Sequence, residues 1–225
     1  MRWLRSTPLL LFAIAMPLQA QGTATARVTL EKQHHGSHLP SAVLWLSPVN
    51  ATASMPAGGP YVLQQKNRMF SPHILVVPVG AVVSFPNADP FFHNVFSLFE
   101  GKRFDLGLYE KGSSKTVQFN RVGVSYLFCN IHPEMSAVVV SISTPYWSIA
   151  NAAGEMTVNN LPVGDYDAHL WVEGENQERL EKWTHRLSIH NGDNQAGELS
   201  VVPEAAPPAH TNKFGQPYPH EVTPY

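Results

Sequence analysis

The chain has 225 residues, enough for one large or two small domains with buried cores. It carries 15 Lys and Arg residues against 17 Asp and Glu residues, a formal net charge of −2, and it has no basic tract. This charge balance argues against nucleic acid as a partner. The single cysteine excludes a disulfide within the chain.

The first residues have the pattern of a secretory signal peptide. Arg2 and Arg5 precede an apolar run of about ten residues, and small residues follow near Ala20. The run is shorter than the ~20 residues that a membrane-spanning helix needs. We therefore expect residues 1–20 to direct export and to be removed. The mature protein would then be periplasmic or otherwise exported, with no membrane span.

Short apolar stretches rich in Val, Ile, Phe and Tyr alternate with turn residues over much of the chain. Several alternate apolar with polar residues, as half-buried strands do, and no long stretch has helical spacing. Such a series predicts an all-β fold, a sandwich or barrel with Greek-key connections. The predicted strands are 26–30, 41–46, 73–78, 81–85, 93–98, 102–107, 115–119, 124–129 and 136–142.

The strand pattern restarts after residue 146. "GEMTVNNLPVGDYDAHLWVEG" (154–174) predicts a strand, a tight turn and a second strand, and further strands are expected near 184–190 and 196–202. This stretch resembles the transthyretin-like or carboxypeptidase-regulatory-like β-sandwich modules. The alternative is that these strands extend the sheets of the first domain.

The predicted organisation is a larger β-sandwich followed by a smaller one. The Pro-rich end of the chain is expected to be extended and could lie across the surface. The expected boundaries are a signal peptide at 1–20, a first domain with extra N-terminal strands at 21–143, a smaller β-sandwich at 144–203, and a Pro-rich tail at 204–225.

The stretch "YLFCNIHPEM" (126–135) contains the single cysteine, and His132 and Met135 follow Cys129 at steps of three residues. If Cys129 ends a strand and the chain then turns, both side chains can approach the sulfur. His93, in "FPNADPFFHNVFS", offers a second imidazole from another strand. Two imidazoles, a thiolate and a weakly bound thioether form the trigonal site of blue copper proteins. A buried, inert cysteine is the alternative.

These residues resemble the cupredoxin family over about 71–142, and the Cys-x-x-His-x-x-Met loop is similar to the short amicyanin or plastocyanin-like ligand loop. The resemblance implies a Greek-key cupredoxin β-sandwich with one type-1 copper centre, alternating between Cu(II) and Cu(I). Its ligands would be His93, Cys129, His132 and an axial Met135. By the same resemblance, the backbone N–H of Asn94 would reach the ligand sulfur and tune the potential.

The whole chain resembles exported multi-domain cupredoxins that carry the label methylamine utilization protein. Amicyanins are single domains, whereas this chain adds strands before residue 70 and a module after 143. No residue here points to methylamine itself. Glu134 also places an acidic side chain between two expected ligands.

Other residues have both a functional and an ordinary interpretation. His73 could be a fifth ligand or an outer partner of the site, or could simply pack, and Glu173 with Glu175 could form an acid pair or a turn. Phe91, Phe92 and Pro133 could surround the metal and form a docking patch, or the two phenylalanines could be core. The remaining histidines could form further metal sites or be solvated; they are His34, His35, His38, His210 and His220.

The expected function is that of an exported type-1 copper protein that carries single electrons through an exposed edge of His132. By resemblance, its partner would be a c-type cytochrome or a larger oxidoreductase. The alternatives are a copper storage or delivery protein, and a binding or assembly module with a structural metal site. Enzyme activity is not expected, because four protein ligands leave little room for a substrate. Zinc could also bind such donors, but a thioether favours copper.

Overall fold

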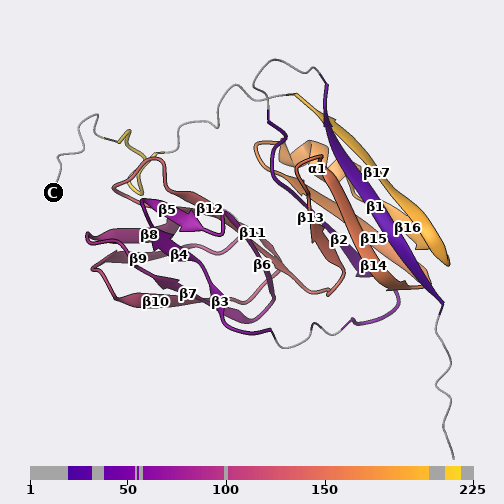
Figure 1. Ribbon diagram of the computed structural model, residues 1–225, viewed down its shortest axis with the longest axis horizontal. Helices are drawn as coiled ribbons and strands as arrows, with labels where there is room; N and C mark the ends of the chain where they lie inside the picture. The colour runs from indigo at the N-terminus through magenta and orange to yellow at the C-terminus, as the bar shows by residue number, and fades with distance from the viewer. Residues whose placement is uncertain are drawn as a thin grey trace, which may run out of the picture.

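The computed structural model describes residues 20–31, 38–53, 55, 58–98, 101–202 and 211–218, and it shows two β-sandwiches side by side (Figure 1). These residues form 17 strands and one short helix, which confirms the all-β fold class. Within this described part, no helix has the length and apolar character needed to cross a membrane. The expected signal peptide lies outside the described residues, apart from Ala20.

The first sandwich has one sheet in the order β10-β7-β3 and another in the order β6-β12-β11-β8-β9, with a β4-β5 hairpin beside them. The chain changes sheets between β6 and β7, between β7 and β8, between β9 and β10, and between β10 and β11, as in Greek-key connections. The strands are β3 (Tyr61–Val62), β4 (Gln64–Lys66), β5 (Met69–Ser71), β6 (Ile74–Pro78), β7 (Ala81–Pro86), β8 (His93–Ser97), β9 (Phe104–Tyr109), β10 (Ser114–Phe119), β11 (Gly123–Phe128) and β12 (Ser136–Ile142).

The two sheets of the first sandwich enclose one apolar core. Alternate residues of β7 and β10 point inward, so that Val83 lies opposite Val117 while Phe85 and Phe119 are almost fully buried. The side chains of the single cysteine and of the methionine six residues later belong to this same cluster. The core therefore ends at the expected metal site.

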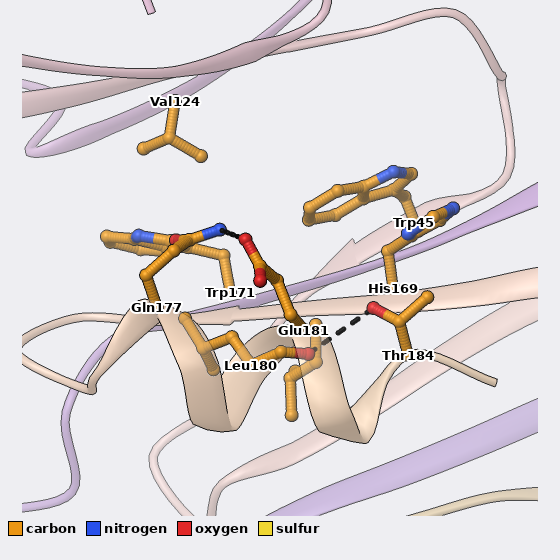
Figure 2. Close-up of a pocket in the computed structure, with 9 residues that line it drawn as sticks. Trp45, Val124, His169, Trp171, Gln177, Leu180, Glu181 and Thr184 are labelled. Carbon is orange, nitrogen blue, oxygen red and sulfur yellow. Dashed lines mark hydrogen bonds between the residues drawn. The ribbon is translucent and has the colours of Figure 1, made fainter. Parts of the chain in front are cut away.

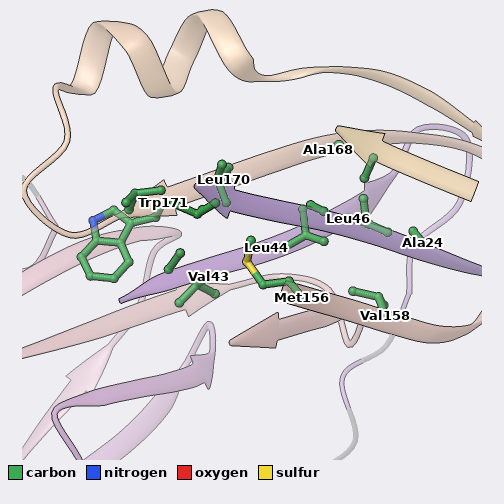
Figure 3. Close-up of a cluster of buried hydrophobic side chains, with 14 of the residues drawn as sticks. Ala24, Val43, Leu44, Leu46, Met156, Val158, Ala168, Leu170 and Trp171 are labelled. Atoms are coloured by element: carbon green, nitrogen blue, oxygen red, sulfur yellow. The ribbon is translucent and has the colours of Figure 1, made fainter. Parts of the chain in front are cut away.

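The second sandwich has sheets in the orders β14-β1-β17 and β13-β2-β15-β16. Its inner faces carry alternating small and large apolar side chains, including Ala24, Leu44 and Met156 (Figure 3). Its elements are β1 (Gln21–Leu30), β2 (Ala42–Pro48), β13 (Trp147–Ile149), β14 (Glu155–Pro162), β15 (Gly164–Val172), α1 (Gln177–Trp183), β16 (His185–Ile189) and β17 (Gly192–Val201).

The sequence analysis assigned the N-terminal strands to the first domain, and this prediction is wrong. β1 lies between β14 and β17, and β2 lies between β13 and β15, so both belong to the second sandwich. Alternating hydrophobicity shows which face of a strand is buried, but it does not identify the strand that pairs with it. The second sandwich is therefore built from both parts of the chain, and the first is inserted between Pro48 and Thr144.

Strand β12 joins the two cores because it is buried on both faces. Ala137 and Val139 point into the first core, whereas Val138, Val140 and Ile142 pack into the second. This explains the unbroken apolar run of the strand, since a strand with two buried faces needs no polar alternation. The two sandwiches are packed together along this strand.

Helix α1 was not expected from the sequence. The Asn176 side chain accepts a hydrogen bond from the Glu178 backbone at 2.8 Å and caps the first turn. Leu180 is its buried residue, and Lys182 lies in the last turn. With seven residues the helix is too short for its apolar spacing to stand out.

Candidate metal centre

Three of the four predicted metal ligands, the cysteine and the two histidines, lie together in the first sandwich. His93 is the first residue of β8, Cys129 follows the last residue of β11, and His132 lies on the turn to β12. The Cys129 Sγ is 3.9 Å from Nδ1 of His93 and 3.5 Å from Nδ1 of His132. One ligand atom from each lies within 4.8 Å of the others.

The connection between β11 and β12 holds this arrangement. The Cys129 N–H donates to the Met135 carbonyl at 3.2 Å, and the Met135 N–H donates to the His132 carbonyl at 3.1 Å. The loop is therefore a closed turn that fixes the histidine beside the sulfur. The Met135 thioether is fully buried in the same apolar cluster as Cys129.

The three donors are almost inaccessible to water. His93 and Cys129 are fully buried, and His132 is 5% exposed. The exposed histidine edge expected from the sequence is therefore small. Phe91 covers the two imidazoles, with ring centroids 5.2 Å from His93 and 5.6 Å from His132.

The surroundings of Phe91 contain the expected apolar surface. Phe92 is 52% exposed and Pro133 is also exposed, so both face outward beside the buried donors. The Arg68 guanidinium lies 5.3 Å from the centre of the Phe91 ring. The positive charge of Arg68 thus lies beside the apolar rim formed by Phe92 and Pro133.

Asp89 orients His93 and was not found by the sequence analysis. Its Oδ2 accepts a hydrogen bond from Nε2 of His93 at 2.8 Å. The carboxylate also accepts the backbone N–H groups of Asn67 at 2.7 Å and Arg68 at 2.9 Å. With its proton held on Nε2, the imidazole directs its free Nδ1 lone pair toward the sulfur. The one feature of the sequence that could have indicated this role is the position of Asp89, an acidic residue four positions before His93.

The charge on Asp89 is maintained by these contacts. Burial alone would raise the pKa of its carboxyl, but the hydrogen bonds from Arg68 and His93 leave that pKa below its ordinary value. Asn67 and Arg68 have φ values of 55° and 54°, the backbone of a two-residue hairpin turn. This turn aims both N–H groups at the carboxylate.

The backbone N–H groups of Asn94, Ile131 and His132 act against burial to lower the pKa of the Cys129 thiol. A hydrogen bond from the Asn94 N–H to the ligand sulfur, which the resemblance implied, stays a prediction. Burial nevertheless dominates and raises the pKa of the Cys129 thiol, with a further contribution from the charge of Glu134. A cation between the donors would favour the thiolate, since a coordinated thiol is deprotonated.

The donor set fits a copper ion. A metal about 2.3 Å from a thiolate and about 2.0 Å from an imidazole nitrogen, as zinc is, holds those donors about 3.5–4 Å apart. The measured separations of 3.5 and 3.9 Å agree with this spacing. Two imidazoles and a thiolate suit copper and zinc alike, and a buried thioether in the same loop favours copper.

The other candidate residues do not join this centre. His73 contacts the Ser136 carbonyl at 3.3 Å and the Glu173 carboxylate at 2.7 Å, so it links the two sandwiches. Glu175 instead pairs with Arg179 at 2.9 Å. His38 is exposed. Among the described residues, the only metal-type cluster is that of the three donors; four of the remaining histidines lie outside them, namely His34, His35, His210 and His220.

A separate cavity of about 150 Å³ lies between α1 of the second sandwich and Val124 of β11 (Figure 2). Trp45 stacks on His169 at 5.2 Å, and Trp171 and Glu181 also line the space. It shares no residue with the three donors. The candidate metal centre therefore lies outside this cavity.

Comparison with known proteins gives structural likenesses only. Neither the protein-family models nor the curated proteins gave a match. A purple cupredoxin from Nitrosopumilus maritimus is 24% identical, with 36% of this chain and 99% of that chain covered and a TM-score of 0.33. An amicyanin variant in its Cu(I) form is 19% identical, with 44% and 98% covered and a TM-score of 0.36.

A copper-containing nitrite reductase from Thermus scotoductus SA-01 is 24% identical over 43% of this chain, with a TM-score of 0.36. This chain covers 25% of the length of that enzyme chain. Because one fold can support many functions, these likenesses do not establish what the centre does.

Proposed function

We propose that the protein binds one copper ion at His93, Cys129 and His132 and carries single electrons, with Met135 as a weak axial ligand. The observation that carries this proposal is the buried sulfur flanked by two imidazole Nδ1 atoms at 3.5 and 3.9 Å. The fold holds one donor atom of each residue within 4.8 Å of the others. Copper bound there would supply a one-electron couple between Cu(II) and Cu(I).

The chain itself supplies rigidity and exclusion of water. Asp89 fixes the orientation of one imidazole, and the turn between Cys129 and Met135 fixes the other. Donors held in this way need little rearrangement when the charge of a bound ion changes by one. Phe91 and the core of the sandwich keep water from the sulfur. These properties suit an electron carrier better than a site that admits a substrate. We therefore propose that the protein is not an enzyme.

The proposal includes export to the periplasm or beyond, because the first 20 residues have the signal-peptide pattern. Its redox partner would be a c-type cytochrome or a larger oxidoreductase. The surface suited to docking is the apolar rim at Phe92 and Pro133, which lies beside the almost buried His132.

The test is the visible spectrum and copper content of the purified mature protein, measured together with Cys129→Ser. We expect one copper ion per chain and an intense thiolate-to-copper absorption band that reversibly bleaches on one-electron reduction. Cys129→Ser should remove the band while leaving the β-sheet circular dichroism intact. Copper bound at one equivalent without this band would reject the proposal.

A further inference from the structure

The segment 211–218 near the end of the chain lies against the loop that carries the cysteine. Figure 1 shows it in yellow, at the end of the first sandwich remote from the second. The Tyr218 hydroxyl donates to the carbonyl oxygen of Cys129 at 2.7 Å. The Lys213 backbone N–H donates to the Asn130 side chain at 3.0 Å. Two neighbouring residues of the ligand loop are thus held by a segment more than 80 positions away in the sequence.

A second connection runs through Asp105 on β9. The Lys213 ammonium contacts Oδ2 of Asp105 at 2.7 Å, and Oδ1 accepts the Asn94 side-chain N–H at 2.7 Å. Asn94 directly follows the predicted ligand His93 on β8. Lys213 is therefore linked through Asp105 to Asn94, beside the ligand His93, and Tyr218 binds the backbone of the cysteine itself.

The segment has its own local structure, which lets it present these two side chains together. The Asn212 side chain accepts the backbone N–H groups of Phe214 at 2.9 Å and Gln216 at 3.0 Å. Gly215 has a φ of 75° and its N–H bonds the Asn212 carbonyl at 2.9 Å, which closes a turn. This side-chain-capped turn contains Lys213 and is followed two residues later by Tyr218.

We propose that residues 211–218 form a C-terminal strap that positions the cysteine of the copper centre, with Lys213 and Tyr218 as positioning residues. This inference rests on the proposed copper function. The Cys129 N–H is bonded by Met135 and its carbonyl by Tyr218, so the backbone on both sides of the thiolate is fixed. Hydrogen bonds around a ligand set its orientation and tune the metal. The strap is thus part of the site, although it comes from outside the sandwich.

The experiment compares Tyr218→Phe and Lys213→Gln with matched controls in the full mature chain. Tyr166→Phe removes a tyrosine hydroxyl that donates to a backbone carbonyl at 2.8 Å in the second sandwich. Lys182→Gln removes a lysine that pairs with Glu178 on α1 at 2.7 Å. Lys213→Arg retains the charge beside Asp105 and should behave as the wild type.

We expect both strap variants to keep the thiolate-to-copper band, but with a shifted maximum and reduction potential, and to release copper to a chelator about tenfold faster. The two control variants should match the wild type in all three measurements. An unchanged potential and unchanged release rate in both strap variants would overturn the proposal.

Hydrogen–deuterium exchange on protein prepared without copper tests whether the strap holds the cysteine loop, independently of copper binding. Tyr218→Phe should speed exchange in peptides covering 128–135 as well as 211–218, whereas Tyr166→Phe should change neither. Exchange in 128–135 identical to the wild type would contradict the strap even where the copper band is present. Absence of the thiolate-to-copper band from the wild-type protein would instead reject the proposed copper function. The exchange measurement would then still decide whether the strap holds the loop.

Discussion

At the scale of single residues, the centre depends on how His93 is held. The buried imidazole lies between the Asp89 carboxylate on Nε2 and the Cys129 sulfur on Nδ1. Burial, the largest influence, lowers the pKa of His93, whereas the carboxylate opposes that effect. A neutral imidazole with its proton on Nε2 is the form that can bind a metal through Nδ1.

Asp89→Asn should weaken copper binding without unfolding the protein. The amide can still occupy the space, but it removes the negative charge that fixes the imidazole proton. Loss of such a partner costs about 10- to 100-fold in metal affinity. Competition with a calibrated copper chelator measures the effect. Asp167→Asn, which breaks a 2.8 Å contact with Arg186 in the second sandwich, is the control and should leave affinity unchanged. Equal affinities for both variants would contradict the role of Asp89.

At the scale of the elements, the sandwiches are joined where the connection from β5 to β6 meets the end of β15. There Nε2 of His73 lies 2.7 Å from the Glu173 carboxylate, and Nδ1 contacts the Ser136 carbonyl at 3.3 Å. The hydrogen bond with Glu173 raises the pKa of His73 above its ordinary value. Burial would raise the pKa of Glu173, but the contact with His73 leaves it lowered.

This contact should stabilise the fold over a limited pH range. The contribution of His73 is complete below its ordinary pKa of 6.5 and is lost as the pH rises through the raised folded value. The contribution of Glu173 is present above its ordinary pKa of 4.5 and is lost as the pH falls through the lowered folded value. The pair therefore contributes most between pH 4.5 and 6.5.

His73→Gln should lower the melting temperature by no more than about 3 °C near pH 5.5, since the pair is partly exposed. The difference from the wild type should shrink toward pH 8 and again below pH 4. Differential scanning calorimetry across that range measures it, with His190→Gln as the control for an exposed histidine. A difference that stays constant from pH 4 to pH 8 would show that the ion pair is not responsible.

The strands were largely predictable from sequence, and their partners were not. Alternating burial in β7 and β10 is visible in the residue pattern, as is the turn before β15. The pairing of β1 with β17 depends on two segments about 170 residues apart, and no local pattern encodes it. The three donors were predicted because cysteine and histidine are chemically distinctive. Asp89 and Tyr218 were missed because their roles arise only from contacts in the folded chain.

At the scale of the whole molecule, the second sandwich requires both sides of the inserted first one. β1 and β2 occupy inner positions in its two sheets, and each pairs with strands from beyond residue 146. The two sides also meet at the insertion point, where the Leu46 N–H donates to the Tyr146 carbonyl at 2.9 Å and the Thr144 hydroxyl donates to the Leu46 carbonyl at 2.7 Å.

Residues 144–202 alone should therefore fail to fold, because both sheets would lack an inner strand. A chain of residues 20–48 joined by a short Gly-Asn-Gly linker to residues 144–202 should instead fold, since the joined ends already lie side by side. Circular dichroism and urea unfolding distinguish the two: the joined chain should show a cooperative transition and the shorter fragment none. Cooperative unfolding of 144–202 alone would contradict this account of the fold.

The central claim is that one metal ion is held by His93, Cys129 and His132, and the position of that ion tests it most directly. Anomalous scattering at the copper edge, from crystals of the copper-loaded mature protein, locates the ion. The account predicts one strong peak within bonding distance of the Cys129 Sγ and of both imidazole Nδ1 atoms. A principal peak at His38, His73 or any other place, with no copper beside the sulfur, would contradict it.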